Sequence, residues 1–181
     1  MKKHFAILSL CILISFGTNA QNYYQLETDL SDPAIAKGGS LFLTYGFNKN
    51  AISIGGAINQ LPKMLNEQSD DFNEKRNFQF TLEYQRFFKD GAKGFYVGAN
   101  TNYSNITIEE LSTNAKADLD VFRVGAVIGY VWMPWKGLVI NPFVNPRASF
   151  GFDDTKFTSG KTYDGEAFAP FGGLKVGWRF K

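Results

Sequence analysis

The stretch FAPFGGLKVGWRFK, from Phe168 to Lys181, decides the fold because its residues alternate between two different faces. Even positions are mostly apolar and end in Trp178 and Phe180, whereas odd positions include glycines together with Lys175 and Arg179. A period of two is typical of a β-strand. An apolar face with an aromatic end, opposite a charged face padded with glycine, predicts a strand between lipid and a polar interior.

The amino terminus has the features of a secretory signal peptide. Lys2 and Lys3 precede the mostly apolar run Phe5 to Phe16, and small residues lead to Ala20. The apolar run is shorter than the roughly 20 residues that span a bilayer as a helix. We therefore expect residues 1–20 to be a signal peptide cleaved after Ala20, and residues 21–181 to form one barrel domain.

Cleavage at this point changes the chemistry that the chain can perform. It removes Cys11 and His4, the only cysteine and the only histidine. Disulfides, thiolate nucleophiles, imidazole bases and His/Cys zinc sites then cannot form. It also removes Lys2 and Lys3, so the formal net charge falls from +2 to zero, which argues against nucleic-acid binding through a basic patch. We expect no enzyme, no cofactor and no metal site.

Seven further segments share the alternation, at about 24–30, 40–47, 51–60, 77–85, 95–104, 122–132 and 138–152. Asn48 lies in a tight turn between two of them, because asparagine tolerates positive φ. Pro142 and Pro146 interrupt the segment at 138–152. Because proline lacks a backbone donor, they predict a local bulge there.

The connections between these segments alternate in length. Those after the second, fourth and sixth strands are short, whereas residues 61–76, 109–120 and 153–165 form long polar connections. Barrels of the outer membrane have short periplasmic turns and long extracellular loops. The acidic pairs in the long connections could hold a divalent cation. They lack the spacing of a calcium loop, so solvated carboxylates are the simpler interpretation.

The chain from residue 21 onward resembles the small eight-stranded outer-membrane β-barrels of bacteria, similar in architecture to the OmpA transmembrane domain and OmpX. Its aromatic last strand resembles the closing strand of such barrels, which serves as their assembly signal. The resemblance implies an all-β, eight-stranded antiparallel up-and-down transmembrane β-barrel in the cell outer membrane. It also implies outer-membrane lipids and the barrel assembly machinery as partners.

Aromatic residues gather at both ends of the predicted strands. Those beside short turns predict one membrane-interface girdle: Tyr45, Phe47, Phe88, Phe95, Trp132, Trp135, Trp178 and Phe180. Those beside the long connections predict a second girdle: Phe78, Tyr103, Phe122, Phe150 and Phe168.

The opposite face places charges in the lumen: Glu27, Asp29, Glu83, Arg123, Arg147, Lys175 and Arg179. Side chains fill the interior of an eight-stranded barrel, so these charges must pair or be hydrated. The first strand closes against the last, which predicts that Glu27 and Asp29 pair with Lys175 and Arg179. Glycines within the strands are expected to make room for bulky neighbours across the lumen.

These features favour a non-enzymatic outer-membrane protein with a structural or surface-interaction role, whose extracellular ligand, if any, is unknown. The chain ends at its last predicted strand, so we expect no periplasmic domain after the barrel. Three alternatives stay open: a narrow channel or transport protein, an outer-membrane lipid-modifying enzyme, and a soluble periplasmic lipocalin-like barrel. The last of these requires the apolar face to point inward.

Overall fold

The structure is a computed structural model that describes residues 22–34, 36–60 and 68–180. The expected signal peptide therefore lies outside the described residues. Nearly all of the described chain is β-strand, with one short helix, α2 (Ser31–Ala34). In this part of the chain no helix is long and apolar enough to cross a bilayer.

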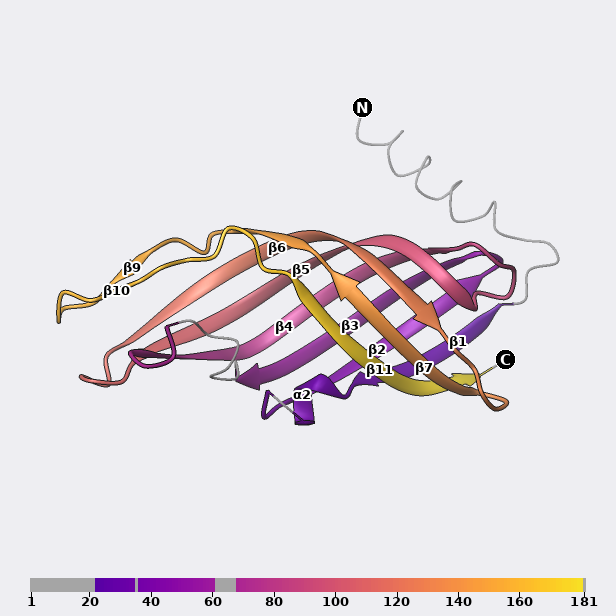
Figure 1. Cartoon of the computed structure of the whole chain (residues 1–181), viewed down its shortest axis with the longest axis horizontal. Coiled ribbons are helices and arrows are strands. Elements are labelled where there is room, and N and C mark those ends of the chain that lie inside the picture. Colours follow the sequence, from indigo (N-terminus) through magenta and orange to yellow (C-terminus); the bar gives the residue numbers. More distant parts are fainter. Residues whose placement is uncertain (1–21, 35, 61–67, 181) are drawn as a thin grey trace, which may run out of the picture.

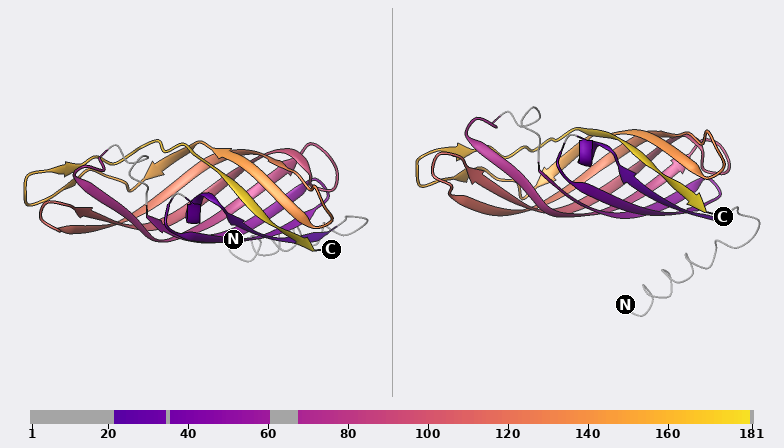
Figure 2. Two further views of the ribbon diagram at one scale, coloured as in Figure 1. Left: turned by 60° about the horizontal axis from the view of Figure 1, so that its bottom comes forward. Right: turned by 90° about the horizontal axis from the view of Figure 1, so that it is seen from below.

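The strands form a closed antiparallel barrel, which confirms the predicted fold (Figures 1 and 2). In sequence order they are β1 (Tyr23–Asp29), β2 (Gly39–Phe47), β3 (Asn50–Gln60), β4 (Phe72–Phe87), β5 (Gly94–Glu110), β6 (Lys116–Val131), β7 (Leu138–Asn145), β8 (Arg147–Phe150) and β11 (Phe171–Phe180). Because β7 and β8 both pair with β6 and lie end to end, the wall has eight strands. β1 pairs with β11 and closes it.

The two ends of the barrel differ. The inner end carries the short turns after β2, β4 and β6, where β1 begins and β11 ends; the outer end carries the longer connections (Figure 1). Asn48 has a φ of 53° in the β2–β3 turn, as predicted for asparagine there. At the outer end, β9 (Thr155–Lys156) and β10 (Thr162–Tyr163) form a small hairpin.

The predicted bulge at the prolines is wrong. Strand β6 keeps one register past Pro146, pairing Ile128 with Val144 and Gly125 with Arg147. The side-chain amide of Asn145 donates to the carbonyl of Ala126, which faces Pro146 in this register. The Ala126 N–H in turn donates to the Pro146 carbonyl at 3.2 Å. The amide thus replaces the donor that proline lacks, and no extra residue is needed.

The wall does carry a bulge, at Asn77 of β4. The register against β5 shifts between Arg76 and Phe78, and the Asn77 amide donates to Asn105 at 2.9 Å and to Thr107 at 2.7 Å. One extra residue reverses which side chains point inward. Glu74 and Arg76 are therefore buried before the bulge, whereas Phe78 is exposed after it.

Three strands extend beyond the predicted limits. Strands β4, β5 and β6 continue toward the outer end of the barrel through residues 72–76, 105–110 and 116–121. The predicted connections at 61–76 and 109–120 are therefore wrong in part. Polar pairs on the outer side hold β5 to β6: Thr107 donates to Asp118 at 2.6 Å and Asn105 to Asp120 at 2.9 Å. These contacts help to hold residues 105–110 and 116–121 together as a strand pair, although their polarity alone suggested a loop.

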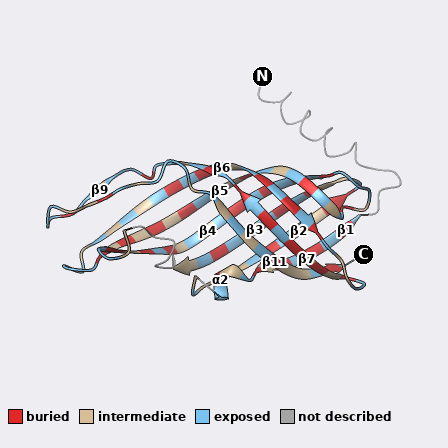
Figure 3. Ribbon diagram, viewed as in Figure 1, coloured by how far each residue is buried: buried red, intermediate tan, exposed pale blue. Residues whose placement is uncertain are grey.

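Polarity along these strands inverts near their middle. In the inner part of β5, Val97 is exposed and Asn100 is buried; further out, Ile108 is buried and Thr107 faces outward. Buried and exposed residues alternate along the strands of the wall (Figure 3). On β6, Phe122 is exposed, and its neighbour Val121 is buried. We call the part with the polar interior the barrel body. We call residues 72–76, 105–121 and 152–165 the outer cap.

Most predicted girdle residues lie on the outside of the barrel body. Phe88, Phe95, Trp132, Trp135, Trp178 and Phe180 are exposed near the inner end, and Tyr45 is half-buried. Phe78, Tyr103, Phe122, Phe150 and Phe168 are exposed near the outer end. Phe47 has the parity of the outward residues of β2 but is only 5% exposed, unlike the other predicted girdle residues. It is the last residue before the Asn48 turn, and its ring lies 5.8 Å from that of Tyr45.

Candidate functional site

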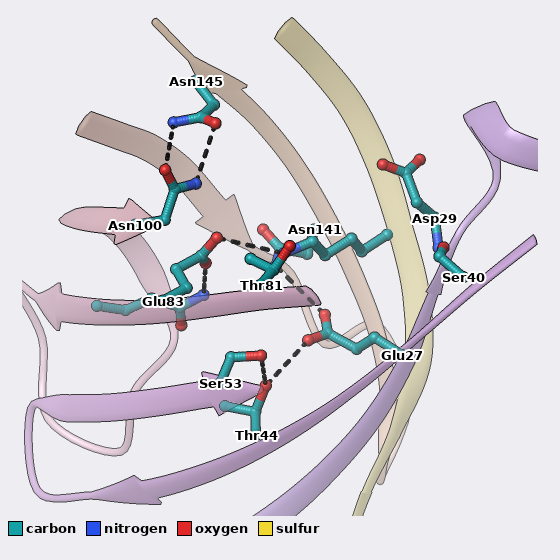
Figure 4. A network of polar contacts seen from close by, with 12 residues as sticks. Glu27, Asp29, Ser40, Thr44, Ser53, Thr81, Glu83, Asn100, Asn141 and Asn145 are labelled. Atoms are coloured by element: carbon teal, nitrogen blue, oxygen red, sulfur yellow. Dashed lines mark hydrogen bonds and ion pairs between the residues drawn. The ribbon is translucent and has the colours of Figure 1, made fainter. Parts of the chain in front are cut away.

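The interior of the barrel body holds a layer of polar side chains from most strands of the wall (Figure 4). All seven charges predicted for the lumen are buried there: Glu27, Asp29, Glu83, Arg123, Arg147, Lys175 and Arg179. They reach this layer because alternate residues of every strand point inward. The structure thus brings them into one interior, although their partners differ from those expected.

Lys175 and Glu83 form the centre of this layer. Their side chains are 2% and 3% exposed, and Lys175 Nζ lies 3.5 Å from Glu83 Oε2. The ammonium also lies 4.3 Å from the ring centroid of Phe42 and 4.8 Å from that of Phe143. The Gln85 amide donates to the other oxygen of Glu83 at 2.6 Å. A buried ion pair with this support is costly to break from one side.

Glu27 and Asp29 do not form the ion pairs predicted for them. The backbones are placed as expected, since Asp29 lies opposite Lys175 and Glu27 opposite Gly177. Glu27, however, accepts from the Asn141 amide at 3.2 Å and from the Thr44 hydroxyl at 3.5 Å (Figure 4). Asp29 accepts from the backbone N–H of Ser31 at 2.9 Å. Neutral donors therefore satisfy both carboxylates.

Arg179 binds the inner turn rather than a carboxylate. Its guanidinium donates to Gln25 Oε1 at 2.9 Å and to the carbonyls of Gly91 and Ala92 at 2.9 and 2.8 Å. It also lies 3.7 Å above the ring centroid of Tyr23. This arginine ties the last strand to the β4–β5 turn at the inner end.

Arg123 and Arg147 lie near the outer end of the polar layer. Arg123 donates to the hydroxyls of Ser149 and Ser104 at 3.3 and 3.4 Å, and Arg147 donates to the Ala169 carbonyl at 3.3 Å. Each guanidinium also lies over an aromatic ring, Arg123 over Phe152 at 5.5 Å and Arg147 over Phe171 at 4.8 Å. Cation–π contacts and neutral oxygens stabilise these cations.

An apolar cluster fills the interior at the inner end. Its larger members are Tyr23, Phe87, Tyr96, Val127, Val131, Val139 and Phe143. Interior glycines receive these and other rings: a Cβ on Gly46 would meet Tyr23, one on Gly129 would meet Tyr96, and one on Gly55 would meet Phe42. The strand glycines therefore make room for bulky side chains, as predicted. Each of these rings, however, belongs to the residue directly opposite on the neighbouring strand and not to one across the lumen.

The outer cap has an apolar core of its own. It consists of Phe72, Ile106, Ile108, Val121, Phe152, Phe157 and Tyr163. The β9–β10 hairpin lies in a connection that was predicted to be a polar loop, and it contributes Phe157 and Tyr163 to this core. The ring centroids of Phe72 and Phe157 lie 5.3 Å apart. The hairpin therefore closes over the extended strands.

Polar contacts fix the hairpin in place. Tyr163 donates to buried Glu74 at 2.9 Å, and Lys161 Nζ lies 2.6 Å from Asp71 Oδ1. Burial, reinforced by Glu74, raises the pKa of Tyr163, so its hydroxyl stays a donor. The hydrogen bond to Asp71 raises the pKa of Lys161. Gln68 adds two bonds to the backbone of Asp164, each at 3.0 Å.

The acidic pairs of the long connections mostly serve the cap. Hydrogen bonds, chiefly from Thr113, hold the pKa of Glu110 below its usual value. The amide of Asn105 does the same for the pKa of Asp120. Glu109 pairs with Lys116 at 3.1 Å. Protein donors thus occupy carboxylates that could otherwise be considered for a cation.

Between the two apolar clusters lies a cavity of about 30 Å³, bordered by charged groups that include Arg76, Arg147 and Lys175. A single water needs roughly 10–15 Å³ measured in this way, so the cavity has room for about two waters. Arg76 Nε is buried and has no hydrogen-bond partner among the described residues.

Glu74, Arg76 and the cap core were absent from the sequence-based site. A signal for the core exists: the apolar positions of β5 move from odd numbers, such as Val97 and Tyr103, to even numbers, Ile106 and Ile108. For Glu74 and Arg76 the alternation gives no such signal, because the bulge at Asn77 reverses whether odd or even positions of β4 point inward.

Comparison with known proteins agrees with this architecture. No protein-family model matches the sequence, and no curated protein sequence is significantly similar. The structure is similar to the crystal structure of neisserial surface protein A (NspA), with a TM-score of 0.51 and 12% identity over 91% of this chain and 99% of that chain. A major outer membrane protein from Thermus thermophilus gives a TM-score of 0.47 and 11% identity, over 90% and 100% of the two chains. The likeness to the neisserial protein shows a shared eight-stranded barrel fold.

Proposed function

We propose that this protein is a non-enzymatic barrel of the bacterial outer membrane that holds a rigid cap at the cell surface, with a structural or surface-interaction role. The observation that carries the proposal is the polarity inversion along β5 and β6. Where Val97 and Phe122 face outward, the surroundings must be apolar; where Thr107 and Asp118 face outward, they must be aqueous. A lipid bilayer that ends between these levels accounts for both.

The outside of the barrel body supports a lipid environment. Large apolar side chains there are 37–71% exposed, and aromatic residues border them at both ends. Outer-membrane barrels have such an apolar band between aromatic girdles. A lipocalin-like barrel in solution requires the opposite arrangement, with these side chains lining an internal cavity.

The interior opposes a conducting pore. The apolar cluster around Phe87, Tyr96 and Val131 fills the inner end, the cap core covers the outer end, and the cavity between them has only about 30 Å³. Ion conduction needs a continuous hydrated path. Catalysis lacks support as well, since residues 22–180 contain no histidine or cysteine.

The cap has features of a binding surface. Its hairpin is fixed by Tyr163, Lys161 and Gln68, so it presents a defined shape. An open hollow of about 690 Å³ lies beside it, lined by residues from Ser149 to Asp154 with Gly165 and Ala167. Fixed loops on a rigid scaffold are common sites of recognition.

Gel mobility of the outer-membrane fraction, with and without boiling, tests this proposal. We expect recovery in the outer membrane and a shift in mobility on heating, because closed barrels often resist detergent until heated. Planar-bilayer recordings of the same preparation should show no steady conductance. A soluble periplasmic protein without a mobility shift would refute the barrel in the membrane, and regular channel steps would favour transport.

A further inference from the structure

An open groove crosses the outer surface of the barrel body at its outer end. It has a volume of about 420 Å³ and lies over β2, β3 and β4, between Leu41, Ile58 and Phe78. Its floor includes Gly39, Gly56 and Ala57. Large apolar side chains cover most of the lipid-facing surface, but here small residues leave a hollow.

Nothing in the described chain fills this hollow. A Cβ added to Gly39 would have no atom within 4 Å, and one added to Gly56 would meet only the Gln79 carbonyl, at 3.5 Å. By contrast, the interior glycines Gly46 and Gly129 lie directly against aromatic rings. The two groove glycines therefore leave open space on the outer face of the wall.

Two lysines flank the outer end of the groove. The N–H of Gln60, two residues beyond groove residue Ile58, donates to the Ala36 carbonyl at 2.8 Å, which places Lys37 on one side of β3. On the other side, Lys75 lies directly opposite Gln60 in the β3–β4 register. Both lysines are exposed, and neither forms an ion pair with a described residue.

The distance between the lysines suits a single anionic group. Neighbouring strands lie about 4.8 Å apart, so the two backbones that flank β3 are about 10 Å apart. Lysine side chains are long and flexible enough for both ammonium groups to reach a phosphate between them. Below that point the groove is apolar, which matches a hydrocarbon chain.

We propose that this groove binds one lipid of the outer leaflet, with an acyl chain along Gly39 and Gly56 and a net negative phosphate head group between Lys37 and Lys75. The inference rests on the proposed function, because it needs the groove to lie within a bilayer. An anionic lipid is favoured over a second copy of the chain because two unpaired cations beside the apolar groove would repel their own symmetry mates.

Native mass spectrometry of the detergent-solubilised barrel tests the proposal. The probe is an equimolar mixture of phosphatidylglycerol and phosphatidylcholine with identical acyl chains, so that only the head group differs. We expect one retained lipid, with phosphatidylglycerol preferred by at least about tenfold, since each lysine near an anionic head group contributes about fivefold. The double variant Lys37→Gln/Lys75→Gln should retain a lipid without this preference.

Filling the groove should abolish retention. In Gly39→Leu/Gly56→Leu the new side chains occupy open space, so folding is expected to persist while the bound lipid is lost. Ala148→Leu, on a lipid-facing site of the opposite wall, and Lys156→Gln, on the hairpin, are matched controls that should leave retention unchanged.

Heat-dependent gel mobility of every variant separates the two hypotheses. If the barrels shift normally but wild type retains no lipid, shows no head-group preference, or binds equally well with the groove filled, the lipid site is refuted and the membrane barrel stands. A wild-type dimer that the groove-filling variant abolishes would also refute it, in favour of a second copy. A missing shift in wild type would refute the membrane barrel itself.

Discussion

The barrel body and the outer cap are two parts of the same hydrogen-bonded wall with opposite polarity. Within β5, Asn100 and Ile108 both point inward, yet one enters a polar layer and the other an apolar core. The backbone ladder runs through both parts without interruption on the β5–β6 side. The difference teaches that secondary structure is common to both parts, whereas the surrounding medium decides which face is apolar.

The two interiors are stabilised by different forces. In the proposed bilayer, hydrocarbon outside the barrel body would give no hydrophobic reason to bury apolar side chains, and charge pairing and hydrogen bonds specify the interior. In the cap, water outside restores the hydrophobic effect, and aromatic and branched side chains form the core. The same kind of substitution should therefore change stability by different amounts in the barrel body and in the cap.

The largest effect is expected from Glu83→Lys in the barrel body. It would place a second cation beside Lys175 in a site where both side chains are at most 3% exposed. Breaking a buried ion pair costs about 3–5 kcal/mol, and like charges add to this. Urea unfolding in lipid vesicles should show the loss. The exchange Glu83→Lys/Lys175→Glu should recover part of it, and unchanged stability of the single variant would mean that this pair does not support the barrel.

A charge on the outer surface gives the next largest contrast. Ile128→Arg, on the lipid-facing side of β6, should cost about 2–4 kcal/mol, the range for arginine near the middle of a bilayer. Asp118→Arg faces outward from the same strand in the cap, loses only the exposed hydrogen bond from Thr107, and should cost about 0.5–1.5 kcal/mol. Refolding titrations in vesicles measure both. Equal effects would remove the distinction between body and cap.

A smaller, local effect is expected from Tyr163→Phe. It removes the donor to Glu74 and leaves a buried carboxylate without that bond, at a cost of about 1–3 kcal/mol. Hydrogen exchange should become faster in the hairpin at 155–163, while heat-dependent gel mobility of the barrel stays normal. Tyr130→Phe, on the exposed face of β6, is the control and should leave exchange unchanged. Equally slow hairpin exchange in Tyr163→Phe would show that this bond does not hold the hairpin.

The smallest effect is a pH dependence of the cap. The folded pKa of Glu110 is below its usual 4.5, so its contribution is complete above that value and is lost as pH falls through the folded pKa. The folded pKa of Lys161 is raised from 10.5, so its contribution is complete below 10.5 and is lost as pH rises through the raised value. A spin label at Thr158→Cys should be least mobile between about pH 5 and 10.

Two substitutions identify the groups behind the acid limb and the alkaline limb of this profile of label mobility against pH. Glu110→Gln should abolish the acid limb and Lys161→Met the alkaline limb, each without altering the other. A profile that both substitutions leave unchanged would show that other groups control the hairpin.

Most of the barrel body was predictable from the sequence, because a wall with a polar interior and an apolar outer surface imposes a strict alternation along each strand. All eight wall strands were placed, and the outward residues of the last strand, such as Trp178 and Phe180, are exposed as predicted. Partners inside the lumen were harder to predict. Register places Asp29 opposite Lys175, but the direction of a long side chain sends that lysine across the lumen to Glu83.

The cap was missed for a physical reason. Its strands show polar residues outward, so Thr107, Asp118 and the hairpin at 155–163 look like loop sequence when an apolar exterior is expected. The bulge at Asn77 further reverses the parity of β4. The replacement of the proline donor by the Asn145 amide also depends on a side-chain conformation, which periodicity does not report.

Labelling of single cysteines along the outward face of β5 tests the central claim most directly. Cys11 is the only cysteine of the sequence and lies in the expected signal peptide, so Val97→Cys, Thr101→Cys, Asn105→Cys, Thr107→Cys and Glu109→Cys can each be examined alone. With a membrane-impermeant maleimide on intact cells, we predict labelling at 105, 107 and 109 and none at 97 and 101. Equal labelling at all five positions, or labelling at 97 and 101 alone, would contradict a membrane boundary at the polarity inversion.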